Sequence, residues 1–173
     1  KAMGMDAVAL TDRGNLFGAY EFYSQAKEAG VTAIIGCQVN VAPLGMREKV
    51  RDWHQLVLLA QNEKGYRNLA TLISRGWLEG LYFEPRVDLE TIAAHAEGLI
   101  CLTGAGKDGF LNRHLMAGAT EEASRQLALL KNIFGRERLF VELSDHGADS
   151  TLNHTTANMA LADAQDVRVV ATN

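Results

Sequence analysis

Short apolar runs alternate with longer amphipathic segments along this chain, and this alternation limits the possible folds more than any other feature. Runs such as Asp6–Thr11, His54–Ala60 and Gly98–Thr103 have the length and composition of buried strands. Each is followed by a segment whose apolar residues recur at helical spacing. Alternating strands and helices build a largely parallel sheet covered by helices. The sequence therefore predicts an α/β domain.

The element boundaries follow from apolar periodicity and from glycine, proline and capping residues. Strands are predicted at Asp6–Thr11, His54–Ala60, Gly98–Thr103, Arg138–Leu143 and Val167–Ala171. The segment Val31–Val41 is predicted to carry one or two strands, Thr32–Ile35 and Gln38–Val41. Helices are predicted at Phe17–Ala29, Glu63–Gly76, Leu89–Ala96, Gly109–Ala117, Thr120–Phe134 and Ser150–Ala164. Thr120 is a candidate cap for its helix. The expected apolar face of the first helix consists of Phe17, Tyr20 and Phe22 or Tyr23. That of the second helix consists of Tyr66, Leu69, Leu72 and Ile73.

Composition and charge exclude several classes of protein. The chain has 173 residues, of which 47% are hydrophobic and 22% charged, as is ordinary for one globular domain. A net charge of −4 argues against a broad basic face that binds nucleic acid. No apolar run approaches the ~18 residues of a membrane span, and no signal peptide is visible. Cys37 and Cys101 form no CxxC pair, so we expect a reducing, cytoplasmic setting and two small buried hydrophobic side chains.

Generic catalytic motifs are mostly absent, and the histidines are ambiguous. The chain has no P-loop, no nucleophile elbow and no zinc-protease motif. His54 opens a predicted strand and His146 follows one, and the pattern leaves a site role and a structural role equally open for both. The other three lie on predicted helices, where surface positions are expected: His95, His114 and His154.

Polar residues stand where the predicted strands end, and in a β/α barrel this edge holds the site. The set comprises Thr11-Asp12, Gln38, Thr103-Gly104, Ser144-Asp145-His146 and Thr172-Asn173. Among them Asp12, Asp145 and His146 are ionisable, and they are candidates to line a site.

Five longer segments carry a more specific signal. They are GMDAVALTDRGNLFGAYEFYSQAKEAGVTAIIGCQVNVAP, HQLVLLAQNEKGYRNLATLISRGWLEGLYFEPRVD, EGLICLTG, FVELSDHG and VVATN. In this order they resemble the polymerase-and-histidinol-phosphatase (PHP) domain found at the N-terminus of bacterial DNA polymerase III alpha subunits. The resemblance spans essentially the whole chain. Its poorest match is the charged linker Leu44–Asp52, which is predicted to be a solvated loop.

The resemblance implies an irregular parallel β/α barrel of about seven strands. Members of the family usually begin with a strand that bears an HxH motif, which would precede Lys1 here. They continue after ATN with an Asp-x-His pair, which would follow Asn173. We therefore expect residues 1–173 to be a single PHP-like domain fragment, incomplete at both ends.

The resemblance also implies a metal site, because members surround divalent cations with imidazoles, carboxylates and sometimes a thiolate. Members carry His, Glu, His and Cys at the positions that hold Arg13, Gln38, His54 and Ala105 here. Ala105 has no donor atom, and Gln38 lacks the charge that hard cations prefer. The fixed charge of Arg13 would oppose a divalent cation ~5 Å away by roughly 6–7 kcal/mol at an effective dielectric of ~20. With three of the four positions changed, we expect the cluster to be lost.

Arg13 suggests a substitute for the lost cation. We expect its guanidinium to pair with Asp12, Gln38 or a carboxylate beyond Asn173. The alternative is that Arg13 extends into solvent.

The function implied by the resemblance belongs to a longer parent chain. That parent would be a DNA-directed DNA polymerase, a nucleotidyltransferase of DNA replication, and it would use magnesium bound elsewhere in its chain. This fragment is expected to have no catalytic residues and no cofactor. It would support the polymerase core, contact DNA only through the parent, and be a candidate to dock a proofreading exonuclease subunit.

Two alternatives stay open from the residues. The first is an active metal-dependent phosphoesterase or 3′–5′ exonuclease built on His54 and ligands outside this sequence. The second is a stand-alone phosphatase of the histidinol-phosphatase type. The residues do not distinguish replicative from error-prone subtypes, and they leave the oligomeric state open.

Overall fold

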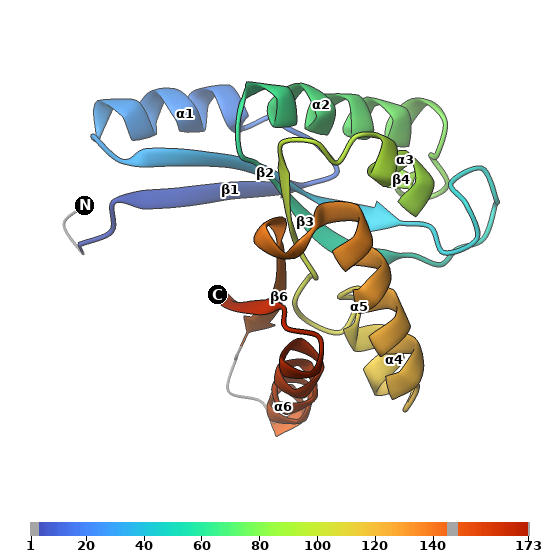
Figure 1. Ribbon diagram of the computed structural model, residues 1–173. Helices are drawn as coiled ribbons and strands as arrows, with labels where there is room; N and C mark the ends of the chain where they lie inside the picture. Colours follow the sequence, from blue (N-terminus) through green and yellow to red (C-terminus); the bar gives the residue numbers. More distant parts are fainter. Residues whose placement is uncertain (1–3, 145–148, 173) are drawn as a thin grey trace.

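The computed structural model describes residues 4–144 and 149–172, with side chains in the last helix described from residue 155 onward (Figure 1). One sheet has the strand order β1-β2-β3-β5-β6-β7, and β4 pairs with β2 beside this path. The sheet curls into a half-barrel, with the helices packed on its convex side.

The strands are β1 (Ala7–Arg13), β2 (Thr32–Val41), β3 (His54–Ala60), β4 (Arg86–Val87), β5 (Leu99–Leu102), β6 (Leu139–Ser144) and β7 (Arg168–Thr172). The helices are α1 (Ala19–Glu28), α2 (Glu63–Leu78), α3 (Leu89–Ala94), α4 (Asn112–Met116), α5 (Thr120–Phe134) and α6 (Asp149–Ala164). None of the helices in the described part of the chain is long and apolar enough to cross a membrane.

The predicted α/β class is confirmed, but one strand runs against the expected direction. The β1–β2, β5–β6 and β6–β7 pairs are parallel, whereas β3 is antiparallel to both β2 and β5. Residues 42–53 join β2 to β3 without a helix, and a connection without a crossover helix favours an antiparallel neighbour. The sheet is therefore mixed.

Strand β2 is one continuous strand, the first of the two possibilities, one or two strands, predicted within Val31–Val41. Gly36 and Cys37 continue the ladder, paired with Leu59 and Leu58 of β3. Glycine is required at position 36 for packing, because a Cβ there would lie 2.5 Å from the Leu59 side chain. Strand β4, with only two residues, was not predicted.

The core lies between the sheet and the helices. Cys37 and Val39 of β2 face this side, together with Leu56 and Leu58 of β3. Fully buried helix residues pack against them, namely Leu69 and Leu72 of α2 and Leu127, Leu130 and Phe134 of α5. Burying each leucine contributes roughly 1.5–3 kcal/mol.

Both cysteines are buried in this core, which confirms their interpretation as small hydrophobic side chains. Burial raises the pKa of Cys37 to about 11. Burial also raises the pKa of Cys101, with a smaller contribution from the Glu142 carboxylate. Neither thiol is suited to form the reactive thiolate at neutral pH.

Helix α2 is held very close to β5. Asn62 caps the helix by accepting a hydrogen bond from the Gly65 N–H at 2.9 Å. A Cβ on Gly65 would lie only 1.8 Å from the carbonyl oxygen of Gly98, which precedes β5. Glycine at position 65 therefore allows direct backbone contact between α2 and the start of β5.

The predicted apolar face of the first helix is wrong. Phe17 precedes α1 and is 87% exposed, and Tyr20 is 84% exposed. Ala19 and Ala26 are buried instead. The start of α1 lies close to β1, since a Cβ on Gly18 would lie 3.1 Å from the Leu10 side chain. Small residues therefore fit this side of the helix better than aromatic rings.

Two smaller helix predictions also change. Thr120 is the first residue of α5, and the capping position is Ala119 without a side-chain cap. On α2 the predicted leucines are buried, whereas Tyr66 is exposed.

The charged linker Leu44–Asp52, predicted as a solvated loop, is anchored by a buried cation. The Arg86 guanidinium donates to the carbonyls of Met46, Glu48 and Val50 at 3.2, 3.0 and 2.7 Å. It also donates from Nε to the carbonyl of Gly80 at 3.2 Å. One side chain on β4 thus fixes a loop that precedes it by more than thirty residues.

Candidate functional site

The two faces of the sheet carry different side chains, and the predicted site positions divide between them. Successive side chains of a strand point to opposite faces. Val57 and Leu59 of β3 line a hollow on the concave face, whereas Leu56 and Leu58 lie in the helix-side core. The register across the strands therefore decides which predicted positions can meet.

Arg13 and Gln38 do meet on the concave face. Arg13 is opposite Gln38 in the β1–β2 ladder, and Gln38 is opposite Val57 in the β2–β3 ladder. The Gly14 N–H donates to the Gln38 carbonyl at 2.9 Å, which fixes the turn after β1. Gly14 has a φ of 66°, a conformation that suits glycine.

The prediction that Arg13 pairs with Asp12 or Gln38 is wrong. Arg13 is exposed, and its guanidinium makes no hydrogen bond or ion pair with any residue in 4–144 or 149–172. Asp12 points to the opposite face, where its Oδ2 accepts from the Gly18 N–H at 3.3 Å. The third predicted partner, a carboxylate beyond Asn173, lies outside the sequence.

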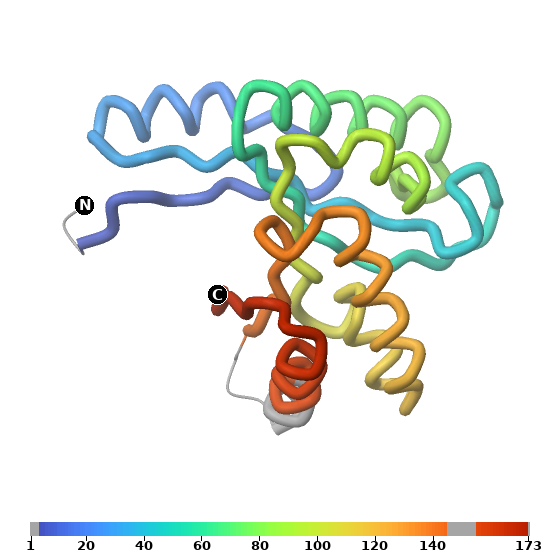
Figure 2. The backbone as a smooth tube through the Cα atoms, viewed as in Figure 1, coloured from blue at the N-terminus to red at the C-terminus, as the bar shows by residue number. Residues whose placement is uncertain are grey.

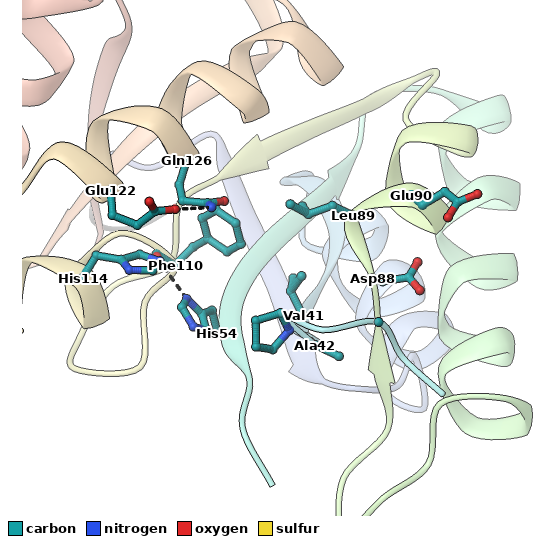
Figure 3. Close-up of a pocket in the computed structure, with 12 residues that line it drawn as sticks. Val41, Ala42, His54, Asp88, Leu89, Glu90, Phe110, His114, Glu122 and Gln126 are labelled. Atoms are coloured by element: carbon teal, nitrogen blue, oxygen red, sulfur yellow. Dashed lines mark hydrogen bonds between the residues drawn. The ribbon is translucent and has the colours of Figure 1, made fainter. Parts of the chain in front are cut away.

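His54 also lies on the helix side. It is opposite Val41 in the β2–β3 ladder, and its ring centroid lies 5.6 Å from that of Phe110 and 4.9 Å from that of His114 (Figure 3). His54 therefore cannot face the same site as Arg13 and Gln38, and its expected place in that ligand set is corrected. Gln55, the next residue of β3, faces the concave side instead.

The position after β5 does reach the concave end of β3. A Cβ on Gly104 would lie 2.2 Å from the Gln55 carbonyl oxygen, so the loop backbone packs directly on Gln55. Ala105 follows in the same loop, half-buried and without a donor atom. Asp145 and His146, the remaining candidates, lie outside the described residues.

These residues do not fit a metal cluster. Arg13, Gln38 and Gln55 present a guanidinium and two amides, where divalent cations favour carboxylates and imidazoles. Within the described ranges, no group of three or more His, Cys, Asp or Glu side chains could hold a metal ion. We therefore derive no metal-dependent step for the concave face.

A second hollow, of about 510 Å³, lies on the helix side beside His54 (Figure 3). It is lined by Val41, Ala42, Pro43, Gly45, His54, Asp88, Leu89, Glu90, Phe110, His114, Glu122 and Gln126. His114, predicted to be a surface residue, is half-buried here against His54. The sequence alone does not predict this contact, because His54 and His114 are far apart along the chain. The β3–β5 pairing and the loop that follows β5 bring them together.

The electrostatics of this second hollow favour a structural role. Burial lowers the pKa of His54, and the neighbouring His114 and Arg113 lower it further. The His54 Nδ1 lies 3.3 Å from the Phe110 carbonyl oxygen. The Glu122 carboxylate is already engaged, since Gln126 and Arg125 both donate to it. The hollow thus combines a buried imidazole, His54, with a Glu122 carboxylate that is already hydrogen-bonded.

Comparison with known proteins assigns the family. The family model for the PHP domain matches residues 1–146. The chain is 40% identical over 180 residues to the DNA polymerase III subunit alpha of Treponema pallidum, covering 100% of this chain and 15% of that protein. It is 44% identical over 173 residues to the DNA polymerase III subunit alpha of Caulobacter vibrioides, covering 98% of this chain and 15% of that protein.

A solved amidohydrolase from Chromobacterium violaceum has a similar fold, with a TM-score of 0.61 over 99% of this chain and 78% of that chain. At 14% sequence identity this likeness concerns the fold alone. The chain spans 15% of the length of the two curated relatives named above. The match over most of its length shows that the chain belongs to the PHP domain family.

Proposed function

We propose that this chain is the PHP domain of a bacterial DNA polymerase III alpha subunit and serves there as a structural domain without hydrolytic activity of its own. The observation that carries the proposal is the identity of 35–44% to such subunits over nearly the whole chain. The relatives are far longer than this chain, so polymerisation belongs to the rest of the parent.

The chemistry of the concave face supports the structural role. Arg13 places a permanent positive charge beside Gln38, and Ala105 contributes no ligand atom. A phosphodiesterase of this fold needs several anionic or imidazole ligands that converge on its metal ions. The described residues offer no such convergence.

The parent would add deoxynucleotides to DNA with magnesium held by acidic residues elsewhere in its chain. The PHP domain would brace the polymerase core and offer a surface for a proofreading exonuclease subunit. The domain's net charge of −4 suits protein contacts better than direct contact with DNA. The assembly would act in the cytoplasm.

Elemental analysis and activity assays on the full-length parent test this proposal. We expect DNA polymerase activity, no stoichiometric zinc or manganese in the PHP domain, and no 3′–5′ exonuclease activity that depends on it. The triple variant Arg13→His, Gln38→Glu and Ala105→Cys serves as the matched comparison, because it restores the family's donors at three positions. Stoichiometric metal in the unmodified protein, together with metal-dependent hydrolysis, would establish the phosphoesterase alternative instead.

A further inference from the structure

The concave face of the sheet forms an open hollow of about 530 Å³. It is lined by Val8, Ala9, Thr11, Val57, Leu59, Ile100, Leu102, Phe140, Glu142, Val170, Ala171 and Thr172. Its walls are apolar apart from two threonines and a single ionisable side chain, Glu142. The strands β1 and β7, at the two ends of the sheet order, both contribute lining residues. Figure 2 traces the backbone of these strands, in blue for β1 and in red for β7.

Glu142 is a buried carboxylate without a charge partner in the described structure. The residue is 6% exposed, and its Oε1 accepts a hydrogen bond from the Thr172 hydroxyl at 2.6 Å. Its Oε2 is shielded from solvent and has no hydrogen-bond donor in the described part of the chain. A carboxylate in apolar surroundings is strongly destabilised unless a cation or several donors compensate it.

Two arginines on the same face, Arg13 and Arg168, form no ion pair with Glu142 among the described residues. The Arg168 guanidinium lies over the Phe140 ring, 4.5 Å from its centroid, and forms an ion pair with Glu137 at 3.1 Å. Arg13 stands at the exposed end of β1, where its backbone lies opposite Gln38 of β2 and not beside β6. The Glu142 backbone is fixed, because its N–H donates to the Thr103 hydroxyl at 3.0 Å. The Glu142 Oε2 therefore requires a hydrogen-bond donor that these residues do not supply.

We propose that the hollow binds a basic side chain, a lysine or arginine, whose aliphatic stem packs on the apolar walls and whose cationic end donates to Glu142. Long basic side chains combine an apolar stem with a charged tip, as this site requires. A charge-assisted hydrogen bond in a desolvated site is among the strongest that proteins form. A bare divalent cation is a poorer match, because a single carboxylate and two hydroxyls fall short of the six or more oxygens that such ions gather.

The occupant is a residue of the longer chain that contains this domain. This assignment rests on the proposed function, under which the 173 residues are a small part of the parent. The hollow lies between β1 and β7, which each pair with only one strand among the described residues, so a segment of the same polypeptide has access to it.

Small cations test the site on the 173-residue chain itself. n-Butylguanidinium and n-butylammonium carry the stem and the charge, and 1-butanol carries the stem alone. We expect both cations to raise the unfolding midpoint saturably, with 1-butanol at least tenfold weaker. Glu142→Gln should abolish the preference for the cations, whereas the matched charge change Glu137→Gln, at an exposed position, should preserve it. Thr172→Val also alters the hollow but keeps the Glu142 carboxylate, so it should preserve the preference for the cations. This variant shows whether a change in the hollow that disturbs folding is enough to abolish the preference.

Equal effects of cations and butanol, or cation binding that survives Glu142→Gln, would overturn the proposal. Displacement of the probes by magnesium or zinc would show a metal site instead. In the full-length parent the probes should have no effect, and its structure should place a lysine or arginine nitrogen within hydrogen-bond distance of Glu142. An apolar residue at that place would refute the occupant. A parent without polymerase activity but with a basic residue there would refute the proposed function and leave this site standing.

Discussion

Arg86 holds the segment between β2 and β3 in place, and its replacement should cost more stability than any surface change. The side chain is 2% exposed and donates four hydrogen bonds to backbone carbonyls, while its guanidinium carbon lies 5.3 Å from the Tyr82 ring centroid. Burial lowers the pKa of Arg86, so its charge is held at a desolvation cost that the carbonyls offset. Arg86→Met removes the charge and keeps most of the volume.

The magnitude follows from what the variant leaves behind. Each hydrogen bond to a charged group is worth about 1.5–3 kcal/mol, but water can replace part of this once the loop opens. A buried carbonyl left without its donor costs about 1–3 kcal/mol. We expect Arg86→Met to lose about 3 kcal/mol of unfolding free energy. The unfolding free energy of Arg86→Lys should lie between those of the unmodified protein and Arg86→Met, because an ammonium cannot reproduce the planar fork of donors.

Urea denaturation followed by circular dichroism measures this loss as a shift of the midpoint at constant slope. Arg67→Met is the matched control, since Arg67 is largely exposed and pairs with Glu63 one helical turn away. Such a surface pair is worth about 0.5 kcal/mol. A loss below about 1 kcal/mol for Arg86→Met, or one equal to the control, would refute the view that Arg86 anchors the loop.

Three further predictions concern the helix contact, a histidine and the thiols. Gly65→Ala should lose about 1–3 kcal/mol by overpacking, measured by the same denaturation, whereas Gly76→Ala, whose Cβ would meet only ordinary contacts from 3.5 Å, should be neutral or slightly stabilising. Because the pKa of His54 is lowered on folding, the unfolded chain takes up its proton first; stability is therefore full above about pH 6.5 and falls as the pH drops through the lower folded pKa. His54→Phe should flatten this dependence of the urea midpoint, and an unchanged slope between pH 7.5 and 5 would count against it. Cys37 and Cys101 should resist a disulfide reagent until the chain unfolds, so rapid labelling of the native protein would contradict their burial.

The positions of the main strands could be predicted because their apolar runs are long and bounded by turn residues. The direction of β3 could not, since it depends on whether the preceding connection crosses the sheet. The charged segment 44–52 correctly suggested a loop without a helix, and such a loop should have favoured an antiparallel β3. Apolar periodicity also misled on α1, because a helix lying close to a sheet is packed through alanines while its aromatic residues stay exposed.

The candidate site shows a sharper limit of sequence reasoning. On a strand, a displacement of one residue moves a side chain to the other face. Arg13 and Gln38 lie on one face of the sheet, because they are opposite each other in the β1–β2 ladder. His54 does not lie on that face, since the concave position at the start of β3 belongs to Gln55, which follows it. Because strand residues alternate between the two faces, the residue two positions before Val57 shares its concave face, and that residue is Gln55 and not His54.

The open ends of the half-barrel have a consequence for the behaviour of the chain in solution. β1 and β7 each leave one row of backbone N–H and C=O groups unpaired within the described structure, and exposed Val8 and Val169 lie on these strands. Such edges act as templates for intermolecular pairing. The edge of β7 in one molecule and that of β1 in the next are different surfaces, so their pairing is head-to-tail and does not close. At high concentration, the isolated chain should therefore assemble into open-ended oligomers.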